Sequence, residues 1–310
     1  MLSQPLRILH FSDMHVNIQI RHMHWKKWFS KRAAGAINLL RGRARYFDET
    51  EEKMAALVRF KEAQAIDVVI NTGDYTALGL ESELLLAKTL VEPLMTPPQS
   101  YITVPGNHDI YVHEGNSHYR FSEQFCSVLQ NDLPEYCRGG HYPLVRLVGE
   151  EVAIVALNSA KPNPYLWRSD GHIPTQQLEA FDLLLQDERI KGRFVCVVTH
   201  YAPRLANGEP DKKLHGLHNA DAFLASCRAI ERGAILFGHI HHTYRVDIPE
   251  VSLPLFCAGS ATMEGREGAW VYEISAQKIA ARQLVWDGES YRYATGHLQH
   301  AEKGGIDDNA

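Results

Sequence analysis

The sequence lacks any uninterrupted run of the roughly 18–20 apolar residues that a membrane-spanning helix needs, although 45% of its 310 residues are hydrophobic. Its five cysteines are odd in number and form no CxxC pair. Such cysteines fit buried thiols in a reducing compartment better than a disulfide framework. The apolar run 6–11 leads at once into polar residues, so no signal peptide is expected. These absences predict a soluble, cytoplasmic globular protein.

A Pro/Ser-rich linker and an internal repeat are also absent, which favours one large domain over two. We expect this single domain to cover residues 1–296. The remaining segment, 297–310, is polar and contains glycine, so we expect a disordered tail there. The sequence does not indicate an oligomeric state.

Acidic residues are missing from one segment of an otherwise acidic chain. The formal net charge is −5, yet residues 21–45 contain eight Lys or Arg and no Asp or Glu. Trp25, Trp28 and Phe29 begin an apolar stripe at helical spacing, with most of the basic residues off the stripe. The helix expected in this insert, at about 17–47, either lies at the inner face of a membrane or packs on protein as a lid or dimer helix. The uneven charge favours one anionic partner over general nucleic-acid binding.

Short β-rich runs alternate with helical stretches along the first three quarters of the chain. Strands are predicted at 6–11, 67–72, 101–104, 152–157, 194–199 and 234–237, and helices at 49–65, 83–91, 175–186 and 221–232. Strands separated by helices indicate parallel βαβ units and an α/β fold. After residue 252 the runs 255–258, 270–274 and 279–285 predict antiparallel strands that complete a sheet.

Residue types that bind metals follow five of these strands. The five blocks read Asp13-Met-His15, Gly73-Asp74, Gly106-Asn107-His108-Asp109, Thr199-His200 and Gly238-His239-Ile-His241. Ligands in open α/β sheets bind beyond the carboxyl ends of the strands, so the blocks are expected to converge. Together they offer oxygen and nitrogen ligands without cysteine, which suits Mn, Fe or Zn in a catalytic site. Two Asp, one Asn and four His among them, seven ligands in all, fit two metal ions better than one.

The one-residue spacing within two of the blocks has a geometric interpretation. In an extended strand, residues i and i+2 project to the same side. Asp13 and His15 could therefore hold one ion, and His239 and His241 repeat the spacing. A carboxylate such as Asp74 can bridge two cations.

The order DxH…GD…GNHD…H…GHxH resembles the calcineurin-like metallophosphoesterase family, and more closely its bacterial phosphodiesterase-like branch. All five blocks occur in order, and the match extends from Asp13 to His241, about three quarters of the chain. The resemblance implies a two-sheet αββα sandwich with a dinuclear metal centre at one edge.

The resemblance also implies a role for each matching residue. It places Asp13, His15 and His241 on the first metal, Asp74 between the metals, and Asn107, His200 and His239 on the second. His108 would protonate the leaving oxygen or stabilise charge on the phosphoryl group, and Asp109 would orient it. Asn107 would also stabilise the phosphoryl oxygens while a metal-bridging hydroxide attacks phosphorus in line.

The substrate is less well defined by the sequence. The serine/threonine protein phosphatase patterns GDxVDRG and GNHE are absent, because the corresponding stretches are Gly73-Asp-Tyr-Thr-Ala77 and Gly106-Asn-His-Asp109. The expected substrates are small or lipid-linked phosphodiesters and pyrophosphates, as for cyclic nucleotide phosphodiesterases and UDP-2,3-diacylglucosamine pyrophosphatases. The alternative is a metal-binding scaffold with vestigial phosphoesterase activity.

Several of the seventeen histidines are not expected to bind metal. His10 lies inside the first predicted strand and is expected to be a core residue. His242 follows the last block, but its side chain should point away from His241. His215 and His218 lie in the loop after His200, and the sequence leaves open whether they contact substrate.

Overall fold

The computed structural model describes residues 5–16, 32, 46–112, 117–163, 165, 167–275, 278–295 and 299–300. None of its helices in these ranges is long and apolar enough to cross a membrane. Most of the predicted insert at about 17–47 lies outside the described residues. Within it, the structure describes only Arg32, Tyr46 and Phe47.

The strands and helices occupy the following ranges. The strands are β1 (Leu6–Phe11), β2 (Val68–Asn71), β3 (Tyr101–Thr103), β4 (Leu144–Val148), β5 (Val152–Ala156), β6 (Phe194–Val198), β7 (Gly233–Phe237), β8 (Thr243–Val246), β9 (Leu255–Ala258), β10 (Gly268–Ser275), β11 (Lys278–Trp286), β12 (Tyr291–Tyr293) and β13 (Gln299–His300). The α-helices are α2 (Thr50–Ala63), α3 (Glu81–Val91), α4 (Ser117–Gln124), α5 (Thr175–Leu184) and α6 (Ala220–Cys227).

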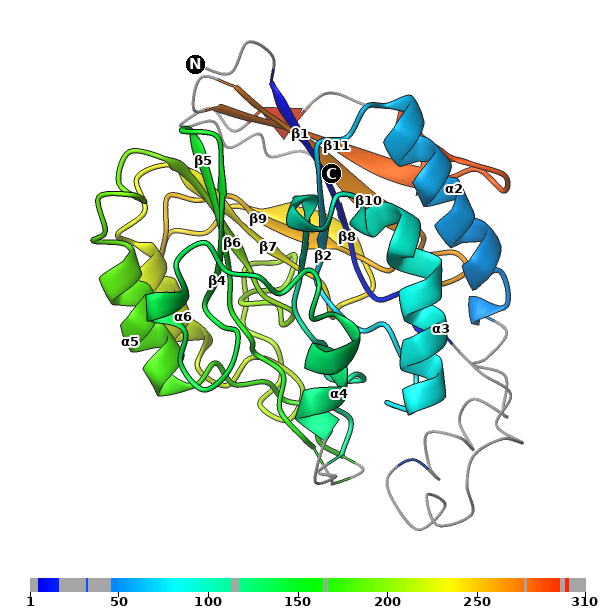
Figure 1. Ribbon diagram of the computed structural model, residues 1–310, viewed down its shortest axis with the longest axis horizontal. Helices are drawn as coiled ribbons and strands as arrows, with labels where there is room; N and C mark the ends of the chain where they lie inside the picture. Colours follow the sequence, from blue (N-terminus) through cyan, green and yellow to red (C-terminus); the bar gives the residue numbers. More distant parts are fainter. Residues whose placement is uncertain are drawn as a thin grey trace.

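Two mixed sheets form the centre of the molecule. The first has the order β12-β11-β10-β1-β2-β3, with β13 also paired to β11, and the second has the order β4-β5-β6-β7-β9-β8. Figure 1 shows α2 and α3 outside the first sheet and α5 and α6 outside the second. The structure therefore confirms the predicted α/β fold, a two-sheet αββα sandwich.

The hydrophobic core explains why both sheets are so apolar. Along β5, Val152, Ile154 and Ala156 join the cluster between the sheets, whereas Ala153 and Val155 join the cluster beneath α5 and α6. All five side chains are fully buried. A strand covered on both faces reads as a continuous apolar run, which is why the sequence located these strands well.

The C-terminal strands differ in part from the prediction. β10 and β11 are antiparallel as expected, but β9 runs parallel to β7. The reason is β8, an edge strand that was not predicted from the sequence. It pairs antiparallel with β9, so the chain has already reversed before β9 returns beside β7.

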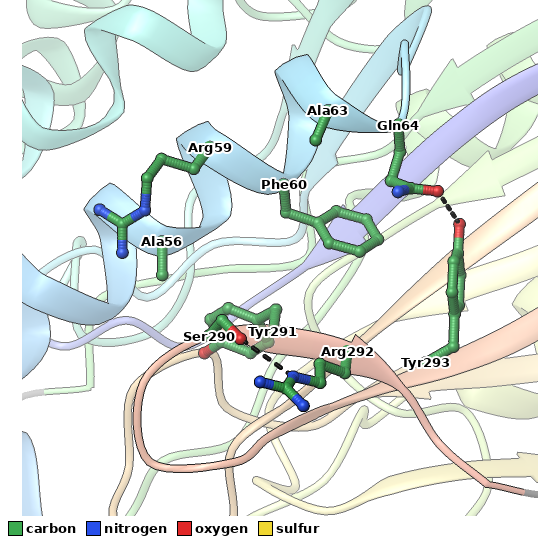
Figure 2. A pocket seen from close by; sticks show the side chains of 9 residues that line it. All are labelled: Ala56, Arg59, Phe60, Ala63, Gln64, Ser290, Tyr291, Arg292 and Tyr293. Atoms are coloured by element: carbon green, nitrogen blue, oxygen red, sulfur yellow. Dashed lines mark hydrogen bonds between the residues drawn. The ribbon is translucent and has the colours of Figure 1, made fainter.

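Shorter elements were also missed, namely α4, β4 and β12. Within the segment predicted as a tail, Gln299–His300 pairs with Ala281 and Ala280 of β11 as β13. A groove between α2 and β12 is lined by Ala56, Arg59, Phe60, Ala63, Gln64, Ser290, Tyr291, Arg292 and Tyr293 (Figure 2). None of these residues is an acid, histidine or cysteine, so the groove does not offer a metal site.

Candidate metal centre

The predicted ligands come together where strands of both sheets end. Asp13 and His15 follow β1, Asp74 follows β2, Asn107 follows β3, His200 follows β6, and His239 and His241 follow β7. These strands run parallel within each sheet, so their carboxyl ends share an edge. Interactions across the two sheets then bring the seven side chains together.

One cluster consists of Asp13, His15, Asp74 and His241, whose ligand atoms all lie within 4.8 Å of one another. His241 Nε2 is 3.1 Å from Asp13 Oδ1 and 3.0 Å from His15 Nε2. His15 Nε2 is 3.8 Å from Asp74 Oδ2. Donor atoms bound to one ion at about 2.0–2.2 Å lie roughly 3 Å apart, so this spacing fits a metal ion.

A second cluster forms around Asn107. Its Oδ1 lies 3.0 Å from His200 Nε2 and 3.0 Å from His239 Nδ1. Asp74 Oδ2 is 3.5 Å from His200 Nε2, so the same oxygen that borders the first cluster also borders the second. Asp74 therefore has the position of a bridging carboxylate.

Backbone carbonyls determine which imidazole nitrogen faces each cluster. His15 Nδ1 lies 3.0 Å from Thr76 O and His200 Nδ1 lies 2.7 Å from Thr72 O. His239 is reversed, because its Nε2 lies 3.1 Å from His215 O. A carbonyl only accepts hydrogen bonds, so the nitrogen beside it is protonated and the other nitrogen presents its lone pair to the cluster.

The backbone at the site adopts an unusual conformation. Six described residues other than glycine have positive φ, and five of them are Asp13, His15, Asp74, His239 and His241. This conformation is costly for residues with a Cβ, and such strain concentrates at functional sites. The extended-strand interpretation of the Asp-x-His and His-x-His spacing is therefore wrong. These ligands lie beyond their strands, where left-handed residues turn the chain around the site.

The electrostatics of the site favour the protonation states that bind metal. Burial alone would raise the pKa of Asp13, but the imidazoles of His241, His200 and His15 hold it below its ordinary value. Burial lowers the pKa of His200, and burial together with neighbouring imidazoles lowers that of His239. An ionised carboxylate and neutral imidazoles are the forms that coordinate a cation.

Asp109 has a different role from the predicted one. Its Oδ2 accepts hydrogen bonds from the backbone N–H of Asp74 and Gly106, and its Oδ1 from those of Tyr75 and Thr76. Asp109 thus clamps the loop that carries Asp74 instead of orienting the His108 ring. Burial raises the pKa of Asp109 to about 6 in spite of these hydrogen bonds.

The His108 ring is held by another group. Its Nδ1 lies 2.6 Å from Ala77 O, and its backbone N–H donates to Asp74 Oδ1. The ring lies edge-on to that of His15, with centroids 4.8 Å apart. The side chain therefore borders the first cluster and leaves Nε2 as the nitrogen not used by Ala77.

Two further residues lie beside the second cluster: Tyr201, which the sequence did not single out, and His215, for which the sequence left substrate contact open. The Tyr201 ring packs on the His239 ring, with centroids 4.3 Å apart. His215 Nδ1 lies 2.5 Å from Asp211 Oδ2 and 3.3 Å from His239 Nε2. The i,i+4 spacing of Asp211 and His215 was the available sequence signal. The ring of His218 instead lies near that of His172, at 6.1 Å.

Two further histidines, His10 and His242, were not expected to bind metal. His10 is fully buried and contacts the Tyr272 hydroxyl and Thr72 Oγ1 at 2.9 and 3.1 Å, which confirms a core role. His242 is exposed.

Of the basic segment 21–45, only Arg32 is described, and it is buried. It donates hydrogen bonds to the carbonyls of Leu78 and Gly79, so this basic residue binds protein.

A family model for calcineurin-like phosphoesterases matches residues 6–243 of the sequence, more than three quarters of the chain. The chain belongs to the calcineurin-like phosphoesterase family. It is accordingly a metal-dependent phosphoester hydrolase of a family that works with two metal ions. No curated protein matches the sequence.

Solved structures of other proteins share this fold. A dimetal phosphatase from Danio rerio is 12% identical with a TM-score of 0.66, and the alignment covers 97% of this chain and all of the other. A purple acid phosphatase from yellow lupin (Lupinus luteus) seeds is 13% identical with a TM-score of 0.52. That alignment covers 96% of this chain and 53% of the lupin enzyme. At such low identity these similarities show the fold alone.

The residues present fit the metal centre that this family requires. Asp13 Oδ1 is buried, and the imidazole nitrogens His241 Nε2 and His15 Nε2 lie 3.1 and 3.7 Å from it. A buried carboxylate oxygen among neutral imidazoles is costly unless a cation occupies the space between them. The donor set, oxygen and nitrogen without sulfur, suits a catalytic divalent or trivalent ion.

Proposed function

We propose that the chain hydrolyses a phosphodiester or pyrophosphate bond in a nucleotide- or lipid-linked substrate. The observation that carries this proposal is the position of Asp74 Oδ2, which borders His15 of one cluster and His200 of the other. A phosphoryl group held beside such a carboxylate would contact both metal positions at once.

Seven residues are proposed as metal ligands. Asp13, His15 and His241 would hold the first ion, Asn107, His200 and His239 the second, and Asp74 both. Mn, Fe and Zn suit the donor set. Two ions, when bound, supply a hydroxide nucleophile near neutral pH and neutralise charge on the phosphoryl oxygens.

The chain's own residues supply the rest of the catalysis. We propose that His108, as an imidazolium protonated on both nitrogens, donates the Nε2 proton to the leaving oxygen or stabilises charge on the phosphoryl group. Ala77 O, against its Nδ1, fixes the ring in a position facing the site. Asn107 would orient a phosphoryl oxygen in addition to binding metal. Asp109 is proposed as a positioning residue, because it holds the backbone of Asp74.

The proposal is tested by hydrolysis after reconstitution with Mn²⁺. The substrates are p-nitrophenyl phosphate, its bis ester, 3′,5′-cyclic AMP and UDP-2,3-diacylglucosamine. We expect the bis ester and at least one nucleotide to be cleaved. Asp74→Asn should reduce the rate at least about 10³-fold, because two ions would lose their shared ligand. The exposed Asp182→Asn on α5 is the matched control.

Metal content provides a readout independent of turnover. The wild-type chain should bind two ions per molecule and Asp74→Asn fewer. A chain that binds metal but cleaves no phosphoester would instead be a scaffold. Preference for the lipid nucleotide, together with sedimentation on anionic vesicles, would assign the basic segment 21–45 to a membrane surface. Turnover of cyclic AMP alone would place the enzyme among soluble phosphodiesterases.

A further inference from the structure

Two aromatic side chains on the loop after β5 lie exposed against each other. Tyr165 and Trp167 are 55% and 68% exposed, more than the other exposed aromatic residue, Tyr46, at 45%. Their rings are stacked, with centroids 5.4 Å apart and an angle of 24° between planes. Stacked rings left in solvent present a flat apolar face, and such surfaces on soluble proteins commonly mark ligand sites.

A buried carboxylate holds this loop in place. Asp170 is 1% exposed and accepts two hydrogen bonds from the Arg168 guanidinium, at 2.7 and 3.0 Å. Lys161 Nζ lies 2.8 Å from the same carboxylate, and Asn163 Nδ2 donates to the Asp170 carbonyl. Residues on both sides of the aromatic pair are thus joined through one buried charge, so the pair has a defined position.

Backbone hydrogen bonds connect the loop to the second metal cluster. Ser169 N–H donates to Leu214 O, the residue before His215. The Tyr201 hydroxyl donates to Ser169 O at 2.5 Å, and the Tyr201 ring packs on His239. Trp167 is two residues from Ser169, which limits their separation to roughly 7 Å. The aromatic pair therefore lies on a loop that is joined to the second cluster through Ser169 and Tyr201.

The charges around the pair suit an anionic ligand. Lys212 and Lys213 are exposed on the segment that pairs with this loop, and Lys161 is one-third exposed beside Asp170. Flat aromatic faces next to cations favour a planar ring joined to phosphate. An acyl chain would require apolar walls on several sides, and the charged side chains here do not provide them.

We propose that Tyr165 and Trp167 form a stacking platform for the nucleobase of a substrate whose phosphoryl group lies at Asp74 and Asn107. This inference rests on the proposed phosphodiesterase function and names the part of the substrate that the enzyme recognises. It applies to a cyclic nucleotide and to a nucleotide-linked lipid alike, because both contain a base.

The test compares a substrate with a base and a substrate without one. Tyr165→Ala, Trp167→Ala and the double variant should raise KM roughly 10- to 100-fold for the p-nitrophenyl ester of thymidine 5′-monophosphate, because base stacking is lost. The kcat for this ester should remain unchanged, as should KM for glycerophosphocholine. Trp167→Phe keeps an aromatic face and should restore KM to within about threefold. Leu183→Ala, 60% exposed on α5, is the control.

Binding of AMP gives a second readout that needs no turnover. AMP should quench the tryptophan fluorescence of the wild-type chain and not that of Trp167→Phe. Unchanged KM values, or equal changes for both substrates, would overturn the platform. Variants that lose vesicle binding while their KM for the nucleotide ester stays unaltered would also overturn the platform, because the pair would then be a membrane contact. If the wild-type chain cleaves nothing, the proposed function fails, while AMP quenching still decides whether the platform exists.

Discussion

The loops of the two sheets contribute to the site in different ways. After β1, β2 and β3, the ligands Asp13, Asp74 and Asn107 follow the strand ends within four residues and are buried. After β5 and β6 the chain makes long excursions that carry exposed residues such as Trp167 and Leu214. The first set of loops can hold reacting groups still, and the second can contact substrate. The proposed metal ligands come from both sheets, because His200 follows β6 and His239 follows β7, whereas the proposed recognition residues lie on loops of the second sheet alone.

Backbone clamping explains why the first set is rigid. Four N–H groups of two loops converge on the single carboxylate of Asp109. A Cβ on Gly73, whose φ is +97°, would lie 2.5 Å from Gly106 N, so the two loops touch at the backbone. Catalytic geometry needs positions accurate to a fraction of an ångström, and such contacts provide them.

The largest effect that would sharpen this comparison is expected at His108. His108→Ala should lower kcat about 10²- to 10⁴-fold, because proton donation to the leaving oxygen is lost. The backbone N–H that binds Asp74 remains, so metal content should stay at two ions. Steady-state kinetics and metal analysis on the same sample check both points. His242→Ala, an exposed neighbour of the site, should behave as wild type, and comparable losses in the two variants would remove His108 from the mechanism.

A smaller effect is expected at Asp109. Asp109→Asn replaces an acceptor oxygen with an amide that faces two N–H donors, so the loops should separate. We expect metal affinity to fall about 10- to 100-fold and unfolding free energy to fall by about 2 kcal/mol. Metal titration and urea denaturation measure the two quantities. If kcat fell at saturating metal without a change in affinity, Asp109 would act on the reaction itself.

Gly171 tests whether the long loops of the second sheet influence a proposed metal ligand. A Cβ at this position would overlap the Tyr201 ring, which packs on His239. Gly171→Ala should therefore displace Tyr201 and lower kcat roughly tenfold, an effect within the range for positioning groups. Ser169→Ala, in the same loop, keeps the carbonyl that Tyr201 uses and serves as control. Equal kinetics for Gly171→Ala and wild type would show that the long loops do not influence the metal ligands.

The smallest effect concerns stability and pH. Burial raises the pKa of Glu83 from 4.5 to about 7, and its Oε1 has no hydrogen-bond partner among the described residues. The folded chain retains this proton between pH 4.5 and 7 while the unfolded chain loses it, so stability should fall as pH rises through that window. Glu83→Gln should remove up to about 3 kcal/mol of this decline. Melting temperatures of the wild type and Glu83→Gln at pH 5 and pH 8 test this prediction. Equal declines in melting temperature for the two proteins would refute it.

Much of the site could be predicted because each ligand is local to a strand end. The runs 194–198 and 233–237 are apolar on both faces, and His200 and His239 follow them directly. Glycine and polar residues after an apolar run mark the place where a strand stops. The order of the blocks then indicated the family and the two-sheet fold.

Other features depend on residues distant in sequence and could not be predicted from local pattern. The His15 nitrogen that faces the site depends on Thr76 O, 61 residues away. The role of Asp109 depends on backbone N–H groups more than 30 residues earlier. His10 and His200 are both fully buried histidines near strands, yet only the packing of neighbours makes one a core residue.

The sequence by itself determined which residue types stand at the strand ends and in what order, because strand formation and turns follow local composition. Only the tertiary structure decided that five of the proposed ligands adopt left-handed backbone conformations, that Asp74 Oδ2 lies between the clusters, and that the exposed rings of Tyr165 and Trp167 stack on each other. The physical reason is that each depends on contacts between loops of two sheets, and these contacts exist only after the sheets have packed.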